Sequence, residues 1–199
     1  TTEIYTLSLH DALPIYRSET NDVAADALLV KKILAGHRDA FADIVRRYQN
    51  RIYGMALHYT RNIEEARDLT QDALVAVYNS LARFDQTRSL TNWVLKIAVY
   101  HCYQYLRKGR RPAKVLDLPA EFPDPLDVQV RAEQREKVLK AFDALGDDLK
   151  MTVWLHYFLE RSCKEIADIL EISLELVKVR LFRARKILGE NLGSNGSDK

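Results

Sequence analysis

Five cationic side chains crowd into nine residues close to the C-terminal end of the chain. They are Lys178, Arg180, Arg183, Arg185 and Lys186. Glu175 is the one acid between residues 173 and 186. Cations along a helix contact DNA phosphates, and those near the start of the helix can reach base edges. The cluster therefore predicts a DNA-binding helix, and a solvated basic surface helix is the alternative.

The residues around this cluster carry the signals of two short helices joined by a turn. Ser162 and Glu165 have the spacing of a capping box, which marks the start of a helix. Ser173 is a second candidate cap. We expect the buried side of the last helix to consist of Leu176, Val177 and Leu181. Two short helices of which the second is cationic predict a helix-turn-helix between residues 162 and 186.

A second cationic cluster follows a helical stretch that is rich in aromatic residues. The cations are Arg107, Lys108, Arg110, Arg111 and Lys114. The aromatic residues are Trp93, Tyr100, Tyr103 and Tyr105. Cations beside aromatic rings suit single-stranded nucleic acid, because every base has a face that can stack. The alternative is a helix-bundle core followed by a cluster of charges at a helix end.

The third feature is an acidic stretch that contains Glu64, Glu65, Asp68, Gln71 and Asp72. Steps of three and four residues place Glu65, Asp68 and Asp72 on one face of a helix. Like charges stacked in this way are mildly destabilising by themselves. The pattern therefore indicates a basic protein partner, and a solvated face is the alternative.

Apolar residues recur at three- and four-residue steps in both halves of the chain, which predicts helices throughout. Further helices are expected over 130–145 and 149–157, ahead of the helix-turn-helix. In the first half, the expected core of a helix bundle is Val30, Ile33, Leu34, Phe41, Ile44, Val45, Tyr48, Ile52, Met55, Ala56, Tyr59, Ala66, Leu69, Ala73, Leu74, Val77, Tyr78, Leu81, Trp93, Val94, Ile97, Ala98, Cys102 and Tyr105.

Four of the five prolines lie between Pro112 and Pro125. Proline removes a backbone donor and disfavours helix at the preceding residue, so we expect an extended linker over 112–128. The predicted fold is all-α, with two small helical domains at 21–111 and 129–190. We expect a disordered tail at 191–199. Residues 1–20 have no sustained helical period, and we interpret them as a non-native or disordered extension; a native flexible extension is the alternative.

Composition and spacing argue against several classes of protein. The formal net charge is only +2, so evidence for nucleic-acid binding comes from local clusters. The five histidines and two cysteines show no metal-ligand or catalytic spacing, and no phosphate-binding glycine loop is present. We therefore expect no enzyme, no cofactor and no metal. No apolar run has the length of a membrane span, and two distant cysteines fit the cytoplasm.

These motifs together resemble bacterial sigma factors of the sigma-70 family, in the extracytoplasmic-function (ECF) group. The stretch EEARDLTQDAL at 64–74 is similar to a pattern of sigma domain 2, D-A-x-D-L-T-Q-[ED]-x-F. The stretch WVLKIA at 93–98, continuing to Leu106 and Arg107, resembles the next motif of that domain. The stretch SCKEIADILEISLELVKVRLFRAR at 162–185 resembles the end of sigma domain 4. The resemblance covers roughly residues 23 to 190, including the linker.

The resemblance implies a protein that binds core RNA polymerase and directs initiation at promoters. It implies contacts with the β′ coiled coil and the β flap, with the linker threading the polymerase, and regulation by an anti-sigma factor in the cytoplasm. The residues implied for the β′ contact are Glu65, Asp68, Gln71 and Asp72. Those implied for the −10 element, with the loop 87–92, are Arg88, Ser89, Asn92, Trp93, Tyr100, His101, Gln104, Arg107, Lys108, Arg110 and Arg111. Those implied for the −35 element are Ser162, Ser173, Glu175, Lys178, Arg180, Arg183, Arg185 and Lys186.

The chain departs from the family pattern at several of these positions. Tyr100 stands where the family has asparagine, and Glu171 stands at the turn glycine of the helix-turn-helix. If that turn needs a left-handed backbone, glutamate costs about 1–2 kcal/mol there, and a reshaped turn is the alternative. Glu175 and Leu176 replace small or polar residues of the recognition helix.

A second hypothesis is a helix-turn-helix regulator that binds duplex DNA without polymerase, its first domain serving as an oligomerisation bundle. The acidic face distinguishes the two hypotheses. Only a sigma factor needs Asp68 and Asp72 to bind core polymerase.

Overall fold

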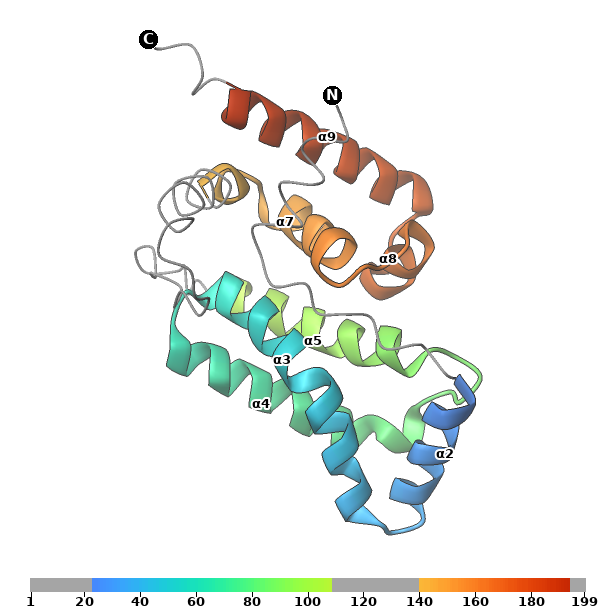
Figure 1. The fold of residues 1–199 in the computed structure, drawn as a ribbon. Helices are drawn as coiled ribbons and strands as arrows, with labels where there is room; N and C mark the ends of the chain where they lie inside the picture. The colour runs from blue at the N-terminus through green and yellow to red at the C-terminus, as the bar shows by residue number, and fades with distance from the viewer. Residues whose placement is uncertain (1–22, 109–139, 194–199) are drawn as a thin grey trace, which may run out of the picture. The chain divides into compact units, whose positions relative to one another are not determined.

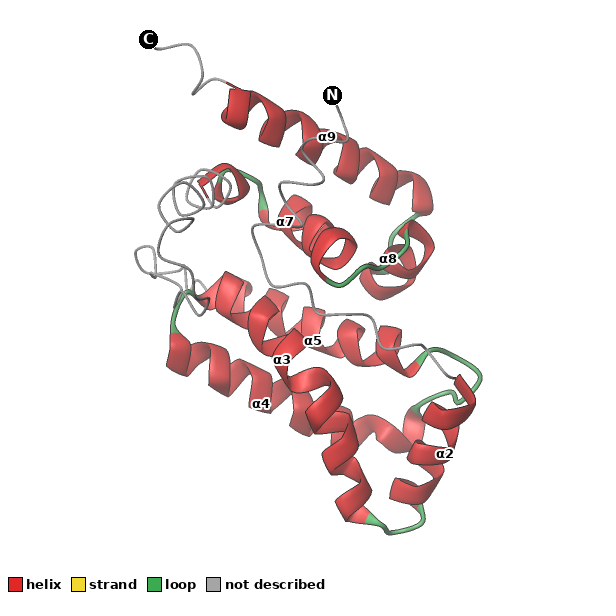
Figure 2. Cartoon of the chain, viewed as in Figure 1, coloured by secondary structure: helices red, strands yellow, loops and turns green. Residues whose placement is uncertain are grey.

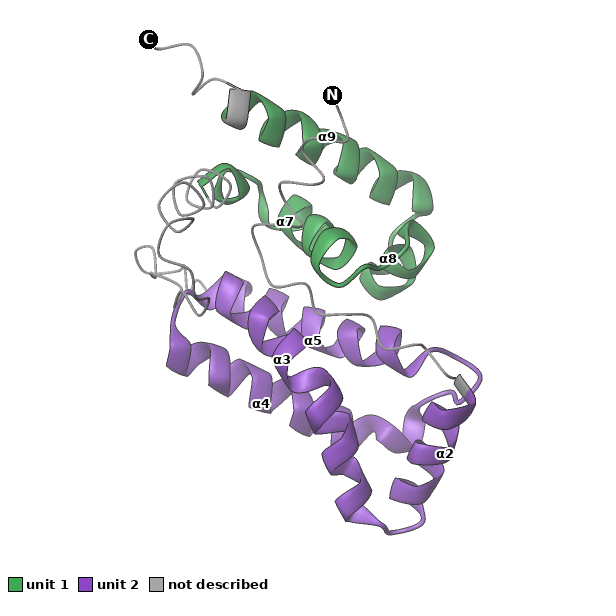
Figure 3. Cartoon of the chain, viewed as in Figure 1, with its two compact units in different colours: residues 1–18, 119–199 green, residues 19–118 purple. Residues whose placement is uncertain are grey.

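A computed structural model describes residues 23–108 and 140–193, which belong to two compact units (Figure 3). The unit that comes first in the described chain spans 19–118 and is purple in Figure 3, where the key labels it unit 2. The second contains 119–199 and is green, labelled unit 1. Every regular element among the described residues is a helix (Figure 2), as the sequence predicts. The predicted linker at 112–128, the extension at 1–20 and residues 194–199 of the predicted tail lie outside the described residues. The tail was expected from 191, and this bound is wrong, because residues 191–193 continue the last helix.

Within residues 23–108, the first unit forms a bundle of four α-helices with two short 3₁₀ turns (Figure 1). The helices are α2 (Val23–Leu34), α3 (Phe41–Thr60), α4 (Ile63–Ser80) and α5 (Leu90–Arg107). The 3₁₀ turns are η1 (Arg38–Ala40) and η2 (Leu81–Arg83). Helix α3 packs against α4 and α5, α4 packs against α5, and α2 contacts α5.

The bundle is built on apolar stripes that largely match the predicted ones. Ile44, Tyr48, Ile52 and Met55 of α3 are fully buried. The Tyr48 hydroxyl is 2.9 Å from the Thr91 hydroxyl, which joins α3 to α5 inside the core. Burial raises the pKa of this tyrosine. The predicted stripes are wrong at their margins, because Leu34 and Tyr78 are exposed.

Helix α4 begins at a well-defined cap. Asn62 accepts hydrogen bonds from the backbone N–H groups of Glu64 at 2.9 Å and Glu65 at 3.2 Å. The preceding residue, Arg61, ends α3 with a left-handed backbone, φ 49°. Acidic residues in the first turn of α4 face the positive end of the helix dipole, which is favourable. The cap thus fixes where the acidic face begins.

The second unit contains α7 (Asp147–Val153), a π-helical turn η3 (Trp154–Phe158), α8 (Cys163–Leu170) and α9 (Leu174–Gly193). Residues 140–143 are also helical, within the helix predicted over 130–145. Residues 144 and 145 form a turn instead, and 130–139 lie outside the described residues. The helix predicted over 149–157 is present, but its second half is π-helical. There the rings of Trp154 and Phe158 stack at 4.2 Å. Helices α7 and α8 both pack against α9.

The turn between α8 and α9 has the left-handed backbone that its sequence position suggested. Glu171 ends α8 with φ 55° and ψ 43°. A side chain in this region costs free energy that glycine does not incur. Glu160, before α8, has φ 52°. Glutamate therefore occupies left-handed positions on both sides of the first helix of the helix-turn-helix.

We expect Glu171→Gly to raise the free energy of unfolding by about 1 kcal/mol, because the Cβ strain is removed. Urea denaturation followed by circular dichroism measures it. Glu171→Ala is the matched control, since it removes the carboxylate but keeps the Cβ, and it should give no comparable gain. Equal stabilisation by both variants would show that charge, not backbone strain, sets the cost.

Candidate functional site

The helix-turn-helix is anchored by a hydrogen-bond network at the start of α8. The predicted capping box is present: the Ser162 hydroxyl accepts from the Glu165 N–H at 3.3 Å, and Glu165 accepts from the Ser162 N–H at 2.9 Å. Arg161, only 6% exposed, donates to the Glu165 carboxylate at 2.9 Å and to the Leu159 carbonyl at 2.8 Å. Ser162 therefore serves to start α8 in a fixed direction.

Helix α9 is set into the unit by its apolar side and by one ion pair. Ser173 caps it by accepting a hydrogen bond from the Leu176 N–H at 3.1 Å. Val177 and Leu181 are buried as predicted. Leu176 was expected among them, and this prediction is wrong: its side chain is 40% exposed. The helix is rotated so that Leu176 lies beside the buried stripe rather than in it.

The five cations of α9 do not all point the same way. Four are exposed: Lys178, Arg183, Arg185 and Lys186. Arg180 instead turns toward α7, where its guanidinium donates to the Asp148 carboxylate at 2.6 Å and is 16% exposed. The ion pair ties α9 to α7, so Arg180 differs from the cations with which the sequence grouped it.

Apolar side chains accompany the exposed cations of α9. Leu176, Val179 and Phe182 are 40%, 41% and 66% exposed. They recur every third residue and lie away from the stripe formed by Val177 and Leu181. The exposed face of α9 is therefore mixed, with both cationic and apolar groups.

The outer face of α5 presents some of the aromatic residues that the sequence indicated: Tyr100 is exposed and Trp93 and Tyr103 are half-buried, whereas Tyr105 is buried against α4. The Tyr100 side chain is 59% exposed, and its hydroxyl accepts a hydrogen bond from the Gln104 amide at 2.8 Å. Trp93 is half-buried, with its ring 5.1 Å from that of Phe84. His101 is half-buried, and burial lowers its pKa. One edge of this surface is thus aromatic and held in place.

The remaining residues predicted for the −10 surface divide into four groups. Arg107 and Lys108 are exposed at the C-terminal end of α5, where the helix dipole favours cations. Arg88 is exposed and pairs with Asp85 at 3.5 Å, and Ser89 caps α5. Asn92 is buried, so its side chain is not on the surface. Arg110 and Arg111 lie outside the described residues.

The acidic face of α4 is largely as predicted. Asp68, Gln71 and Asp72 are exposed. Glu65 is the exception: it is half-buried, and its carboxylate accepts a hydrogen bond from the Tyr105 hydroxyl of α5 at 2.5 Å. Glu65 therefore helps to join α4 to α5, while the other three side chains are available to a partner.

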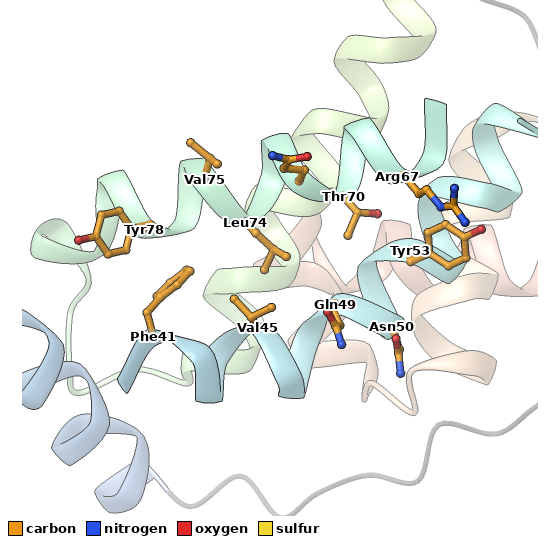
Figure 4. A pocket seen from close by; sticks show the side chains of 11 residues that line it. Phe41, Val45, Gln49, Asn50, Tyr53, Arg67, Thr70, Leu74, Val75 and Tyr78 are labelled. Atoms are coloured by element: carbon orange, nitrogen blue, oxygen red, sulfur yellow. The ribbon is translucent and has the colours of Figure 1, made fainter. Parts of the chain in front are cut away.

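An open apolar groove lies between α3 and α4, next to Gln71 (Figure 4). Its volume is about 670 Å³. The apolar lining residues are Phe41, Val45, Leu74, Val75 and Tyr78. At one end the rings of Phe41 and Tyr78 meet edge to face, 5.0 Å apart. Four of these five were expected in the core from the sequence pattern, so the groove was missed. Val75, which is 51% exposed, is the one lining residue that could have indicated it, because it is an apolar residue on the polar face of α4.

The described residues contain no group of three or more His, Cys, Asp or Glu side chains that could hold a metal ion. Among them, no helix is both long and apolar enough to cross a membrane. Burial raises the pKa of the Cys102 thiol to about 12. The three surfaces on α4, α5 and α9 are therefore the candidates for function.

Comparison with known proteins matches both units. Residues 44–112 match the model of Sigma-70 region 2, and residues 135–188 match that of Sigma-70, region 4. The ECF RNA polymerase sigma factor SigW of Bacillus subtilis is 30% identical over 177 residues, which cover 82% of this chain and 94% of SigW.

Two solved structures share the fold. CnrH, in complex with the cytosolic domain of CnrY, has a TM-score of 0.67 at 23% identity and covers 86% of this chain and 99% of CnrH. RpoE from Bartonella quintana, in complex with the anti-sigma factor NepR, has a TM-score of 0.63 at 23% identity. The match covers 80% of this chain and 98% of RpoE.

Both sigma regions occur in one chain, in the order expected, which favours a sigma factor over a regulator that acts without polymerase. The chain belongs to the sigma-70 family of RNA polymerase sigma factors, in its extracytoplasmic-function group.

Proposed function

We propose that the chain binds core RNA polymerase through α4 and directs initiation at promoters that α5 and α9 recognise. The observation that carries this proposal is the exposed acidic face of α4. The proposed DNA-binding surfaces lie on α5 and α9, so DNA binding does not account for this face. Asp68 and Asp72 would repel DNA phosphates, so this face suits a basic protein partner rather than DNA. We assign the chain no enzymatic activity, and we place its action in the cytoplasm.

The α4 surface suits a basic helical partner, for which we propose the β′ coiled coil. Asp68 and Asp72 offer carboxylates for charge-assisted hydrogen bonds to lysine or arginine. Gln71 adds an amide at the edge of the groove. The groove between α3 and α4 accepts apolar side chains of the same partner, and a central apolar contact with a polar rim is the usual anatomy of an interface.

On α5 we assign Tyr100 a stacking role toward an unpaired base of the −10 element. Its exposed ring offers an apolar face, and Gln104 fixes its hydroxyl. Arg107 and Lys108 supply phosphate contacts beside it, as single-stranded DNA requires. Trp93 and His101 border the same helix face, and Ser89 and Asn92 set its first turn.

On α9 we assign the four exposed cations to phosphates and edges of the −35 duplex. The buried apolar side of α9 leaves these cations exposed toward the major groove. Arg185 also donates to the Leu181 carbonyl at 3.2 Å, and Lys186 pairs with Glu190 at 3.9 Å. Arg180 fixes the angle of α9 through Asp148 and makes no phosphate contact in this proposal. Contact of the second unit with the β flap completes the attachment to polymerase.

We also propose that an anti-sigma factor holds the chain inactive by covering these surfaces. RpoE of Bartonella quintana, which shares the fold, is bound to the anti-sigma factor NepR in its solved structure. Acidic, aromatic and cationic surfaces that must contact polymerase and DNA cannot do so while a protein covers them.

The double variant Asp68→Lys/Asp72→Lys should abolish binding to core polymerase, because a basic partner would then meet two lysines. Promoter-directed transcription should be lost, while nonspecific binding of the free protein to duplex DNA should not fall. Gel filtration with bacterial core polymerase and reconstituted transcription measure both. The matched control is Asp39→Lys/Asp43→Lys, an equal charge reversal at exposed residues near the start of α3. Core binding that survives the α4 reversal would contradict the proposal.

The pKa of His101 should lie below 6.5, because burial disfavours its charged form. Asp72 raises this pKa and Lys108 lowers it, so Asp72→Asn should lower it further and Lys108→Ala should raise it. Titration of the imidazole resonances by NMR measures all three values. Because the folded-state pKa of His101 is lowered, the free energy of unfolding falls as the pH falls through the unfolded-state pKa. An unchanged pKa in the Asp72→Asn variant would show that the α4 acid does not act on the α5 surface.

Four phosphate contacts from α9 should contribute a slope of about −3.6 to the dependence of log affinity on log salt. Lys178→Ala should make the slope of promoter binding by the holoenzyme less steep by about 0.9, because one released counterion is lost. Arg180→Ala should leave the slope unchanged and lower the free energy of unfolding instead. Filter binding across a salt series and urea denaturation separate the two effects. If Arg180→Ala changed the salt slope as much as Lys178→Ala does, Arg180 would be a DNA phosphate contact, contrary to this proposal.

A further inference from the structure

We propose that Leu176 and Val179 recognise thymine methyl groups, so that the chain selects A·T pairs in the upstream promoter element. This inference rests on the proposed function, because it names the bases that α9 contacts. It starts from an observation that DNA phosphate binding does not explain: Leu176 and Val179 are 40% and 41% exposed on a helix that already has a buried apolar stripe.

The position of both residues along α9 fits contact with base edges. The Leu176 N–H is bonded to the capping hydroxyl of Ser173, so Leu176 lies in the first helical turn. Val179 follows three residues later and therefore lies on the same side, one turn on. In a helix-turn-helix, the N-terminal residues of the second helix enter the major groove.

The charges around the apolar pair indicate which partner covers it. Lys178, Arg183 and Lys186 are exposed on the same helix, and Glu175, beside Leu176, is the one acid in its first turn. The cations outnumber it. Cations that flank a small apolar patch match an anionic partner with apolar groups inside a groove. Duplex DNA has this chemistry, since phosphates border a major groove in which the C5-methyl of thymine is the one apolar group.

Side-chain chemistry then restricts the base. Leucine and valine neither donate nor accept hydrogen bonds, so they cannot satisfy the exocyclic amine of cytosine or the acceptors of guanine. Covering those groups without a partner costs free energy, whereas covering a methyl group gains it. The pair therefore favours thymine and disfavours G·C at the positions that it covers.

The decisive experiment removes only the methyl group. The holoenzyme, formed from the full chain and bacterial core polymerase, selects promoters from a pool of duplexes with a randomised upstream element. Each thymine in the selected element is then replaced singly by deoxyuridine, which differs from thymidine only by lacking the C5-methyl. We expect promoter affinity to fall about fourfold at one or two positions, the amount associated with burying one methyl group.

Variants assign the effect to the two residues. Leu176→Ser and Val179→Ser should each remove the thymine-over-deoxyuridine preference at one position. Both residues are on the surface, and thermal melting of each variant checks that it folds. Lys178→Ala is the matched control, because it should weaken binding to the thymine and deoxyuridine promoters equally.

The outcomes separate this inference from the proposed function. Initiation at selected promoters with equal affinity for thymine and deoxyuridine, or selection of an element without thymine, would overturn the inference and leave the proposed function intact. A preference that persists in both serine variants would also overturn it. A chain that never initiates with core polymerase would instead overturn the proposed function, and the inference with it.

Discussion

Burial of one stripe on each of α4, α5 and α9 is the constraint on which every surface of this protein depends. A helix that packs through one face must present the opposite face to solvent, so the core positions decide which side chains remain for partners. Ala66, Leu69 and Ala73 bury one side of α4 and thereby expose Asp68 and Asp72. The same relation exposes Tyr100 on α5 and the cations on α9. The side chains available to partners are therefore those that packing leaves exposed.

Features that depend on neighbours in the sequence could be predicted, and features that depend on contacts between helices could not. The capping box at Ser162 and the left-handed turn at Glu171 are local, and both are present. Arg180 looked like its neighbours, because only the three-dimensional position of Asp148 turns it toward α7. Leu176 was placed in the core because a three- to four-residue period locates a stripe only to within one position at its edge. The groove between α3 and α4 was missed for a related reason: its lining residues are apolar, and sequence does not distinguish an open groove from a closed core.

The surfaces on α4 and α5 are also physically connected within the first unit. Tyr105 donates to Glu65, and the carboxylate of Asp72 acts on His101. A partner that neutralised Asp72 would therefore change the electrostatic environment of the aromatic surface on α5. In a sigma factor, this proximity brings the group that would contact polymerase within electrostatic range of the group that would contact melted DNA.

The single cysteine of the described part of the first unit, Cys102, has a practical consequence. Its thiol is fully buried, and burial raises its pKa to about 12, so both access and ionisation prevent reaction with alkylating reagents. Modification of Cys102 can then proceed only when the bundle opens, so the labelling rate measures how often that unit opens. Cys163, half-buried at the start of α8, belongs to the other unit and can be distinguished by peptide mass. The native chain thus carries its own reporter of how firmly a bound partner holds the first unit closed.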